Sequence, residues 1–419
     1  MNALLIAAQT KDDFYDLSYQ LDELRALVET IDIKVAYTLT QKVDKINPAT
    51  YIGIGKLQEA KNICLAYDID VCIFNDELSP SQMRNVKDII NCDVYDRSYV
   101  VLKIFELRAQ TKEAKLEVKL AKDYYLLPRT DQFKTERVSG ASNVTRGKGE
   151  SESELDKRRI SNEIVQIKKQ IAEINKMQET QVINRKKYDI PIVALVGYTN
   201  AGKSSTMNTI LNYCEQSEDK HVDVKDQLFM TLETYSRKVS YKKQDFILVD
   251  TVGLVSKLPY SLMSSFYSTF RQIKNADLII HVLDASSPYI NEQANVVVST
   301  LYQVDAMTIP QFFLLNKWDN VLSQKIIIPK TNSLPFSNKT GLNVETLLDL
   351  IVNEIAPSTV SVKLLIPYNR GDLFNILEQK GKIEIKDYRE DGVYYEGEIE
   401  KKYYDKVKEF DLEMMVSWK

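Results

Sequence analysis

Apolar runs alternate with amphipathic stretches through the first hundred residues of the chain. The short runs predict β-strands, and the stretches with a 3.6-residue period predict helices. Strands are expected at 3–8, 32–40 and 71–76, and helices at 14–30 and 79–90. Ser79 and Pro80 are typical of a helix start, because the hydroxyl caps free N–H groups and proline suits the first position. We expect a small α/β domain over residues 1–105.

A glycine-containing stretch of this domain, "YIGIGKLQEA", resembles a phosphate-binding loop only in part. Gly53, Gly55 and Lys56 lack the full spacing of that motif. The stretch predicts a plain strand-to-helix turn.

A different pattern begins near Val100. One long helix is expected over 100–127, ending at Pro128, and a second over about 154–184. Isoleucines recur in the second helix at intervals of 4, 3, 4 and 3 residues, which is the spacing of a coiled-coil seam. The seam comprises Ile160, Ile164, Ile167, Ile171 and Ile174, and the first helix offers Leu116, Leu120, Tyr124 and Leu127. An antiparallel helical hairpin over 106–188 is predicted, with a polar tip at about 128–153.

The remaining chain has two patterns. Residues 189–356 alternate apolar strands with helical stretches, as a doubly wound parallel sheet requires. Residues 357–419 predict a small α+β domain with a strand, a helix and a hairpin that turns at Asp391-Gly392. The fold class is therefore α/β with several domains.

Bulk composition limits the class of protein. A chain of 419 residues exceeds one hydrophobic core. No apolar run is long enough to span a membrane, and the first residues lack the pattern of a signal peptide. The spacing of Cys64, Cys72, Cys92 and Cys214 matches no zinc or redox motif. We expect reduced thiols in a cytoplasmic protein.

Charge is uneven along the chain. Residues 107–188 hold 19 Lys and Arg against 12 Asp and Glu, so the hairpin carries +7 and the rest of the chain −11. A basic element on an acidic body indicates a polyanion partner, although charged side chains could also merely solvate the outer faces of the hairpin. The candidate RNA-contact residues of the tip are Arg129, Lys134, Arg137, Arg146, Gly147 and Lys148.

A phosphate-binding loop follows the buried run "IVALV". The stretch "GYTNAGKSS" matches G-x-x-x-x-G-K-[ST] in the required strand-to-helix context. Its backbone N–H groups would wrap the phosphates, Lys203 would neutralise their oxygens, and Ser204 would ligate Mg²⁺. The nucleotide-binding residues expected here are Gly197, Tyr198, Thr199, Asn200, Ala201, Gly202, Lys203, Ser204 and Ser205.

Two further segments complete a magnesium and γ-phosphate site. Asp250 ends an apolar strand and could hold the ion, and Gly253 could present its N–H to the γ-phosphate. Between the loop and Asp250, Thr231 could close on Mg²⁺, which makes Ser204, Thr231 and Asp250 the expected metal ligands. The residues expected at the nucleotide are Phe229, Met230, Thr231, Leu232, Glu233, Asp250, Thr251, Val252 and Gly253.

Two motifs select guanine. The carboxylate of Asp319 could accept bonds from the guanine N1–H and the N2 amino group, and adenine lacks that pair of donors. "SNK" follows the next apolar run, where guanine O6 needs a backbone donor. The expected guanine-site residues are Asn316, Lys317, Trp318, Asp319, Ser337, Asn338 and Lys339.

Together these motifs make the sequence resemble an HflX-type GTPase over nearly its whole length. "ATYIGIGKLQEA", "KLEVKLAKDYYLLPR", "TRGKGESESELDKRRI", "DTVGLVSKLPYSL" and "LLIPYNRGDL" are similar to signatures of that family. The resemblance implies a cytoplasmic GTPase that binds the large ribosomal subunit and splits stalled or idle ribosomes, with the hairpin tip near the peptidyl-transferase region. It implies GTP and GDP as ligands and ribosomal RNA as a partner. We expect a monomer when the protein is free.

Three positions depart from the family pattern. The tip has a shorter glycine run, with Lys148 where proline is usual; Thr234 replaces a proline after Glu233; and Asn338 stands where alanine is usual. Divergence at the tip could mark a paralogue that dislodges antibiotics. Because the guanine contact at position 338 is expected from the main chain, we expect little effect there.

Leu254 stands where many GTPases have the glutamine that orients the attacking water. The family usually has a hydrophobic residue here. Our hypothesis is that Asn200 helps bind K⁺ beside the phosphates, and that Lys203, Thr231 and Gly253 are the other catalytic residues. The alternative, in which Asn200 only bonds its own loop backbone, stays open.

Two rival functions remain open. One is a ribosome-assembly GTPase that never meets whole ribosomes. The other is a non-hydrolysing RNA-binding module in which nucleotide only locks the shape.

Overall fold

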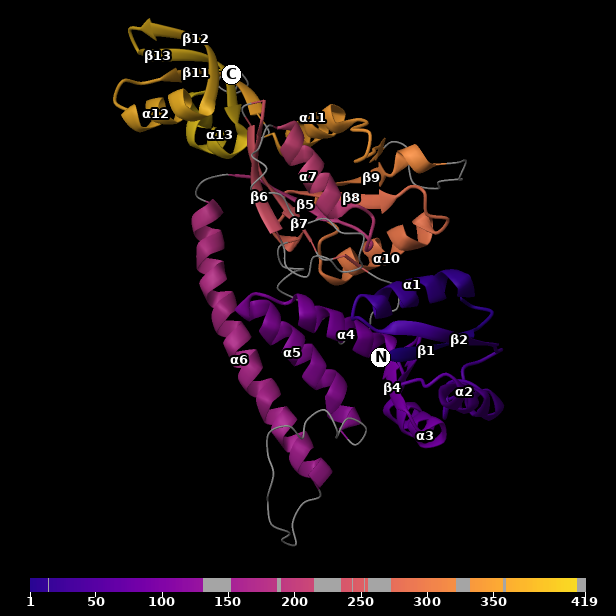
Figure 1. The fold of residues 1–419 in the computed structure, drawn as a ribbon. Helices are drawn as coiled ribbons and strands as arrows, with labels where there is room; N and C mark the ends of the chain where they lie inside the picture. Colours follow the sequence, from indigo (N-terminus) through magenta and orange to yellow (C-terminus); the bar gives the residue numbers. More distant parts are fainter. Residues whose placement is uncertain are drawn as a thin grey trace. The chain divides into compact units, whose positions relative to one another are not determined.

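The computed structural model describes residues 1–13, 15–130, 152–186, 190–214, 235–242, 244–251, 253–254, 273–321, 332–356 and 359–412 (Figure 1). The chain forms two compact units, Met1–Ile351 and Val352–Lys419. None of the described helices is both long and apolar enough to cross a membrane.

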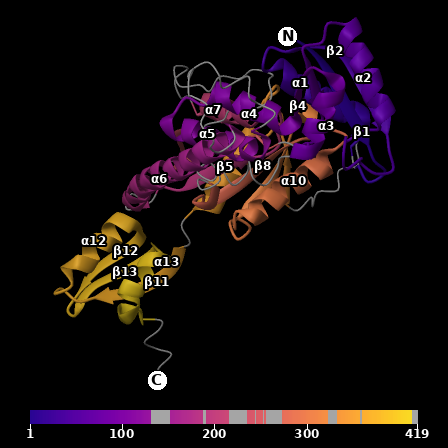
Figure 2. The same cartoon turned by 90° about the horizontal axis from the view of Figure 1, so that it is seen from below.

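A four-stranded parallel sheet organises the N-terminal part of the first unit, in the order β2-β1-β3-β4. Its elements are β1 (Asn2–Gln9), α1 (Leu17–Glu29), β2 (Lys34–Lys42), α2 (Ile54–Ala66), β3 (Val71–Phe74), α3 (Pro80–Ile90) and β4 (Asp93–Asp96). Helices α2 and α3 pack beside each other (Figure 2). The predicted strands and helices are confirmed, including the cap: Ser79 Oγ accepts from the Gln82 N–H at 3.1 Å, and Gln82 accepts in return from the Ser79 N–H. Gly53 precedes α2 as the predicted turn into a helix.

The long helix expected over 100–127 is instead two helices, so that prediction is wrong. Helix α4 (Arg97–Arg108) ends where Ala109 becomes extended, and α5 (Lys112–Leu126) starts anew with Thr111 as its cap. The Thr111 hydroxyl accepts from the Ala114 N–H at 3.2 Å. The polar cap Thr111 marks the break between α4 and α5, although the apolar periodicity continues on both sides of it.

The hairpin seam is confirmed between α5 and α6 (Glu152–Lys186), and a short 3₁₀ turn, η1 (Leu127–Arg129), follows α5. Leu120, Ile160, Ile164 and Ile167 form one buried cluster, and Leu116, Tyr124, Leu127 and Ile171 pack against it. These are the side chains that the heptad spacing selects, with Ile174 outside the cluster.

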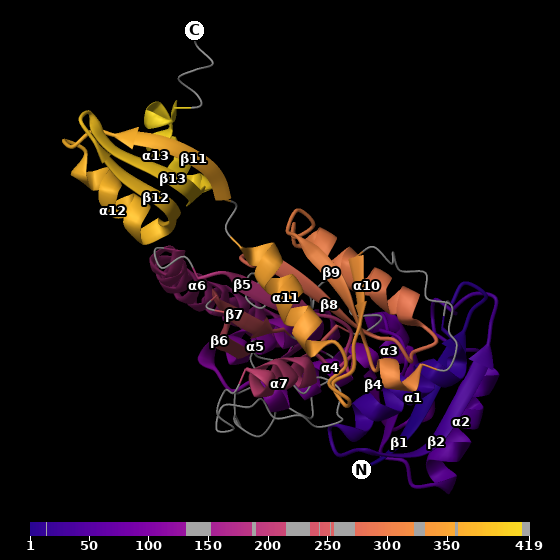
Figure 3. The same cartoon turned by 90° about the horizontal axis from the view of Figure 1, so that it is seen from above.

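A six-stranded sheet carries the second half of the first unit, in the order β10-β9-β8-β5-β7-β6. All neighbouring strands are parallel except β6 against β7. The elements are β5 (Ile192–Val196), α7 (Lys203–Tyr213), β6 (Tyr235–Tyr241), β7 (Gln244–Asp250), β8 (Leu278–Asp284), α10 (Ile290–Gln303), β9 (Gln311–Asn316), η5 (Trp318–Asn320), β10 (Ser333–Pro335) and α11 (Val344–Ile355). Helix α10 packs along β8 (Figure 3). The predicted parallel sheet is confirmed, with one antiparallel edge strand.

The second unit is a three-stranded antiparallel sheet in the order β11-β13-β12. Its elements are β11 (Thr359–Ile366), α12 (Gly371–Lys380), β12 (Gly381–Arg389), β13 (Gly392–Glu400), α13 (Lys401–Val407) and η7 (Lys408–Phe410). The hairpin pairs Arg389 with Gly392, so its turn residues are Glu390 and Asp391, one position earlier than predicted.

Candidate nucleotide-binding site

The phosphate loop leaves the buried strand β5 and enters α7 at Lys203. Gly202 lies just before the helix with φ +95°, and a Cβ there would lie 2.2 Å from Asn316 Nδ2. Asn200 also has a left-handed backbone, with φ 59°. A loop with these two conformations at the start of a helix turns its backbone N–H groups toward one point, as anion binding requires.

Lys203 is buried beneath this loop. Its ammonium donates to the carbonyl oxygens of Gly197 at 3.1 Å and Tyr198 at 2.9 Å. Burial lowers the pKa of Lys203 to about 8, although the nearby Asp250 carboxylate favours the charged form. A cation held in a low-dielectric site interacts strongly with phosphate oxygens.

Asp250 ends β7 next to Ser204, the second residue of α7. The Ser204 hydroxyl donates to Asp250 Oδ2 at 2.5 Å. Burial raises the pKa of Asp250 to about 6, with Lys203 and Ser204 opposing the shift. The other carboxylate oxygen, Oδ1, is buried and has no hydrogen-bond partner in the described part of the chain. A hydroxyl beside an unsatisfied buried carboxylate oxygen is a donor set that Mg²⁺ prefers, so these residues fit the ion.

Gly253 lies close to both parts of this site. A Cβ on Gly253 would lie 2.7 Å from Thr199 Cγ2 and 3.1 Å from the Lys203 ammonium. Only glycine leaves room for this approach. Thr251, by contrast, turns its hydroxyl away and donates to the Leu195 carbonyl oxygen at 2.7 Å. The Thr251 side chain therefore binds the sheet, and a nucleotide contact of Thr251 would come from its main chain.

Leu254 contacts the phosphate loop through its main chain. Its N–H donates to the Gly197 carbonyl oxygen at 3.1 Å, and its own carbonyl accepts from the Thr199 N–H at 2.7 Å. Its side chain is buried in one apolar cluster with Tyr198. Leu254 thus fixes the segment after Asp250 to the loop through main-chain bonds, and its side chain offers no bond to water.

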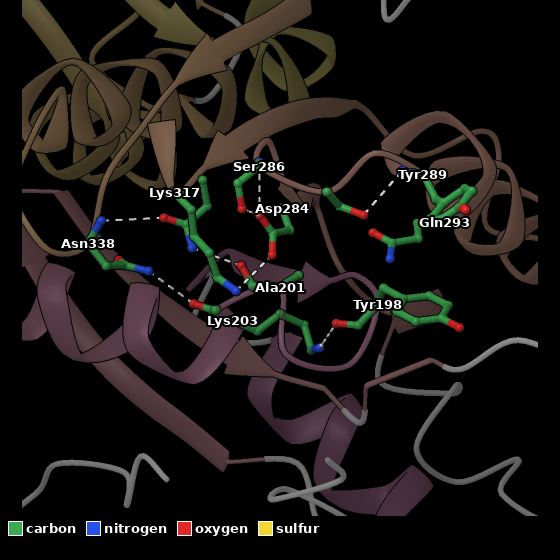
Figure 4. A network of polar contacts seen from close by, with 12 residues as sticks. Tyr198, Ala201, Lys203, Asp284, Ser286, Tyr289, Gln293, Lys317 and Asn338 are labelled. Atoms are coloured by element: carbon green, nitrogen blue, oxygen red, sulfur yellow. Dashed lines mark hydrogen bonds and ion pairs between the residues drawn. The ribbon is translucent and has the colours of Figure 1, made fainter. Parts of the chain in front are cut away.

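The guanine motifs meet the phosphate loop through Asn316, which is buried at the end of β9. Its two partners, Ala201 and Asn338, are labelled in Figure 4. Asn316 Nδ2 donates to the Ala201 carbonyl oxygen at 2.8 Å, and its Oδ1 accepts from the Asn338 N–H at 3.3 Å. Asn316 therefore links the phosphate loop to the loop that holds Asn338.

Asp319 presents its carboxylate at the surface. The Ser337 hydroxyl donates to Asp319 Oδ1 at 2.6 Å, and this bond lowers the pKa of Asp319. Trp318 pairs by its main-chain N–H with the Phe336 carbonyl at 3.0 Å, which brings the two motifs side by side. An ionised carboxylate fixed by one oxygen keeps the other free to accept from a base.

Lys317 and Asn338 add contacts that the sequence motifs do not reveal. The Lys317 ammonium donates to Asp284 Oδ2 at 2.7 Å. The Asn338 amide donates to the Gly202 carbonyl and to Thr206 Oγ1, each at 3.2 Å, and accepts from Thr209 Oγ1 at 3.0 Å. Asn338 therefore ties its loop to α7, which an alanine could not do.

A series of buried side-chain hydrogen bonds and one ion pair connects the phosphate loop to the N-terminal sheet. No pattern in the sequence predicts it. The Tyr198 hydroxyl donates to Glu23 Oε1 of α1 at 2.6 Å. Glu23 also pairs with Arg97 of α4, and the Arg97 side chain is only 2% exposed. Arg97 in turn donates to Asn75 Oδ1 at 3.2 Å.

Several tyrosines join α1 to the region of α10. The Tyr289 hydroxyl accepts from the Asp16 N–H at 3.1 Å, and Gln293 donates to the Tyr19 hydroxyl at 2.8 Å. The Tyr19 and Tyr289 rings lie 4.5 Å apart. Both sets of contacts place the phosphate loop and the N-terminal sheet within one compact unit.

Arg129 is not available to RNA, so its prediction is wrong. The side chain is buried and donates to the Tyr125 and Leu78 carbonyls, at 2.9 and 2.6 Å, and to Glu77 at 3.0 Å. A local count of charge cannot detect these bonds, since Glu77 and Leu78 lie some fifty residues away in the chain.

Other predicted positions lie outside the described residues. In the nucleotide site these are Phe229, Met230, Thr231, Leu232, Glu233 and Val252, and in the hairpin tip Lys134, Arg137, Arg146, Gly147 and Lys148. Of the rest, Ser205 follows Ser204 in α7, and Lys339 is exposed beside Asp319.

Comparison with known proteins finds three GTPase family models and a solved GTP-binding protein. A family model described as "GTP-binding GTPase N-terminal" matches residues 18–106, "GTP-binding GTPase Middle Region" matches 108–185, and "50S ribosome-binding GTPase" matches 192–317. A solved GTP-binding protein from Sulfolobus solfataricus, in complex with GDP, covers 84% of this chain and 98% of its own at 22% identity and a TM-score of 0.45.

Curated relatives match over most of the chain. GTPase HflX of Caldanaerobacter subterraneus is 37% identical, with 90% of this chain and 87% of that protein covered. GTPase HflX of Escherichia coli is 32% identical, with 89% and 87% covered. The protein of the same name in Flavobacterium psychrophilum is 39% identical over 72% and 71%. With this identity over nearly the full length, and with the phosphate and guanine motifs meeting in one site, the chain belongs to the HflX family and is a GTP-hydrolysing enzyme.

Proposed function

We propose that this GTPase binds the large ribosomal subunit in its GTP state, splits stalled or idle ribosomes, and leaves after hydrolysis. The match of residues 192–317 to a family model described as "50S ribosome-binding GTPase" carries this proposal. The excess positive charge of the hairpin supports an RNA partner, because cations that replace counterions at phosphates supply most of such affinity.

Guanine selection falls to Asp319. Its carboxylate is ionised, exposed and fixed on one oxygen by Ser337. The free oxygen would accept from the N1–H and N2 amino donors of guanine, which adenine lacks. Asn316 and Asn338 would support this contact by holding the two guanine loops against the phosphate loop.

We assign Mg²⁺ to Ser204 and Asp250, with Thr231 as a further ligand. The unsatisfied Asp250 Oδ1 and the adjacent hydroxyl are the oxygens that fit the ion. When bound, Mg²⁺ supplies charge neutralisation at the phosphates. The Lys203 ammonium would act on the same phosphates from beneath the loop. Gly253, where a side chain has no room, would approach them with its main-chain N–H.

The Leu254 side chain has no polar group that could position the attacking water for GTP hydrolysis. Intrinsic turnover should therefore be slow and should rise on the ribosome. Asn200 is exposed, and its side chain makes no hydrogen bond to any part of the chain that the structure describes. That leaves its amide oxygen for K⁺ beside the phosphates. Equal turnover in K⁺ and Na⁺ buffers, with and without large subunits, would remove the K⁺ role.

The tip residues Lys134, Arg137, Arg146, Gly147 and Lys148 are the proposed ribosomal RNA contacts. Replacing Arg146, Gly147 and Lys148 together should leave GTP affinity unchanged and weaken subunit binding. Reduced GTP affinity with normal subunit binding would reverse this assignment. We also propose that the free protein is a cytoplasmic monomer.

Sedimentation tests the whole proposal. Whole ribosomes are mixed with the protein and GTP, GDP or a non-hydrolysable GTP analogue, and the subunit peaks are measured. Splitting with GTP and with the analogue, but not with GDP, is expected, because binding drives engagement and hydrolysis drives release. The Lys203→Ala variant, which lacks the phosphate-neutralising ammonium, is the negative control.

Two other outcomes would replace the proposal. Stimulated turnover on free large subunits without splitting would indicate an assembly GTPase. Nucleotide-dependent RNA binding with no ribosome-stimulated turnover would indicate a binding module. Drug-stalled and empty ribosomes tested side by side would show which state the protein acts on, and so whether it serves stress or antibiotic resistance.

A further inference from the structure

Three of the four cysteines come together beside the N-terminal sheet, far from the nucleotide site in sequence. Cys64 lies near the end of α2, Cys72 is the second residue of β3, and Cys92 lies between α3 and β4. The Cys64 and Cys72 sulfurs are 3.4 Å apart, those of Cys72 and Cys92 3.4 Å, and those of Cys64 and Cys92 3.8 Å. The three sulfurs form a nearly regular triangle.

The size of this triangle matches a metal site. Two sulfurs bound at about 2.3 Å to one tetrahedral zinc ion lie about 3.8 Å apart. One edge already has this length, and the other two need to lengthen by only a few tenths of an ångström. A disulfide would instead require a sulfur–sulfur distance of about 2.05 Å, a far larger movement, and would leave the third thiol out.

The surroundings favour a soft ion over a hard one. Cys64 and Cys72 are buried in the apolar core, and Cys92 is half-buried, so the triangle is reached from the side of Cys92. Within the described residues, no His, Asp or Glu joins the three sulfurs as a possible ligand. A site that offers only thiolates selects ions such as Zn²⁺, Cd²⁺ or Cu⁺ over Mg²⁺ or Ca²⁺.

We propose that Cys64, Cys72 and Cys92 form a three-thiolate site for a thiophilic metal ion of the size of zinc, with its fourth position open on the side of Cys92. The site is independent of GTP and of the ribosomal function.

Binding of Cd²⁺ and Co²⁺ tests the proposal. The full-length reduced protein is freed of metal with a chelator and titrated with each ion in the presence of excess Mg²⁺. We expect an ultraviolet sulfur-to-cadmium charge-transfer band that saturates at one ion per chain, and visible cobalt bands of tetrahedral type. GTP hydrolysis in Mg²⁺ is measured on each variant to show that it folds.

Matched variants separate this site from adventitious thiol binding. Cys92→Ser, the least buried of the three, should weaken Cd²⁺ binding by at least about tenfold, since the loss of even outer-shell partners costs about 10–100-fold. Cys214→Ser, a change of the fourth cysteine outside the cluster, should leave both the band and the affinity unchanged. Cys72→Ala is a second test, but its side chain is fully buried, so Cys92→Ser carries the decision.

Several results would overturn the proposal. No charge-transfer band at stoichiometric Cd²⁺, an unchanged band in Cys92→Ser, or loss of the band in Cys214→Ser would each do so. So would mass spectrometry that finds the reduced thiols forming a Cys64–Cys72 disulfide in air while the reduced protein fails to bind Cd²⁺.

Discussion

Replacing Glu23 with glutamine tests the buried chain that links the phosphate loop to the N-terminal sheet. Glu23 accepts from the Tyr198 hydroxyl on one oxygen and pairs with Arg97 on the other. The Glu23 side chain is 7% exposed and that of Arg97 2%. Glu23→Gln keeps the size of the side chain and an acceptor for Tyr198, but it removes the carboxylate charge that pairs with the buried Arg97 guanidinium.

The expected cost is large. Breaking a buried ion pair by removing one partner costs about 3–5 kcal/mol, because the remaining charge stays in a medium of low dielectric constant. At about 2 °C per kcal/mol for a unit of this size, the thermal midpoint of the first unfolding transition should fall by about 6–10 °C. Circular dichroism on heating measures it, without nucleotide and at one scan rate.

Glu59→Gln is the matched control, since Glu59 makes an exposed pair with Lys56 in the same domain. An exposed pair of this kind contributes about 0–1 kcal/mol, so its midpoint should move by about 2 °C at most. Tyr198→Phe should cost about 1.5–3 kcal/mol, the value of a hydrogen bond to a charged group. The double variant Glu23→Gln/Tyr198→Phe should cost less than the sum, because both changes weaken one contact.

A Glu23→Gln midpoint within about 2 °C of the Glu59→Gln midpoint would refute the reasoning. It would mean that water or another group reaches Arg97. Loss of GTP binding by Glu23→Gln with a normal thermal midpoint would also contradict the reasoning. In that variant the main-chain bonds of Leu254 to the phosphate loop should keep the phosphate site in shape.

Three further predictions concern the nucleotide site and the hairpin. Asp319→Asn should lower GTP affinity about tenfold or more and raise affinity for xanthosine triphosphate, because an amide offers a donor to the xanthine O2. Competition binding measures both affinities. An unchanged preference for GTP over xanthosine triphosphate would remove Asp319 from the base site. Because burial raises the pKa of Asp250 to about 6, Mg²⁺-dependent GTP binding should weaken about tenfold per pH unit below 6. In the nucleotide-free protein the contribution of Asp250 to stability should rise as pH falls from 6 toward 4, since at this residue the folded form then binds more protons than the unfolded form. Asp250→Asn should abolish the pH slope of Mg²⁺-dependent binding and reduce the stability slope, the rest of which Asp96 supplies because burial also raises its pKa to about 6. An unchanged stability slope in this variant would assign the proton elsewhere. Ile164→Ala in the hairpin seam should cost about 2–5 kcal/mol and speed proteolysis of α6, with Val165→Ala on the exposed side of the same helix as control.

Local patterns in the chain determined most of the fold. Strands and helices followed from apolar periodicity, and Ser79 formed the expected helix cap because its signal lies within three residues. Four of the five heptad isoleucines pack against the predicted side chains of α5 and η1. The nucleotide motifs are short and contiguous, so their presence at the carboxyl ends of β5, β7 and β9 could be predicted as well. These features depend on neighbours in sequence, and the sequence contains them directly.

Other features depend on which distant side chains share a buried space. Arg129 counts as a tip cation in the sequence, but it is buried against Glu77 and the Leu78 carbonyl. The three cysteines match no spacing rule, because α2, β3 and the turn before β4 bring them together only when the sheet forms. Glu23 becomes a partner of Tyr198 across 175 residues. Periodicity and motifs set the elements, the phosphate loop and the guanine motifs of this GTPase. Tertiary packing alone decided which charges and thiols became neighbours, since desolvation and contact arise only between surfaces that the folded chain brings together.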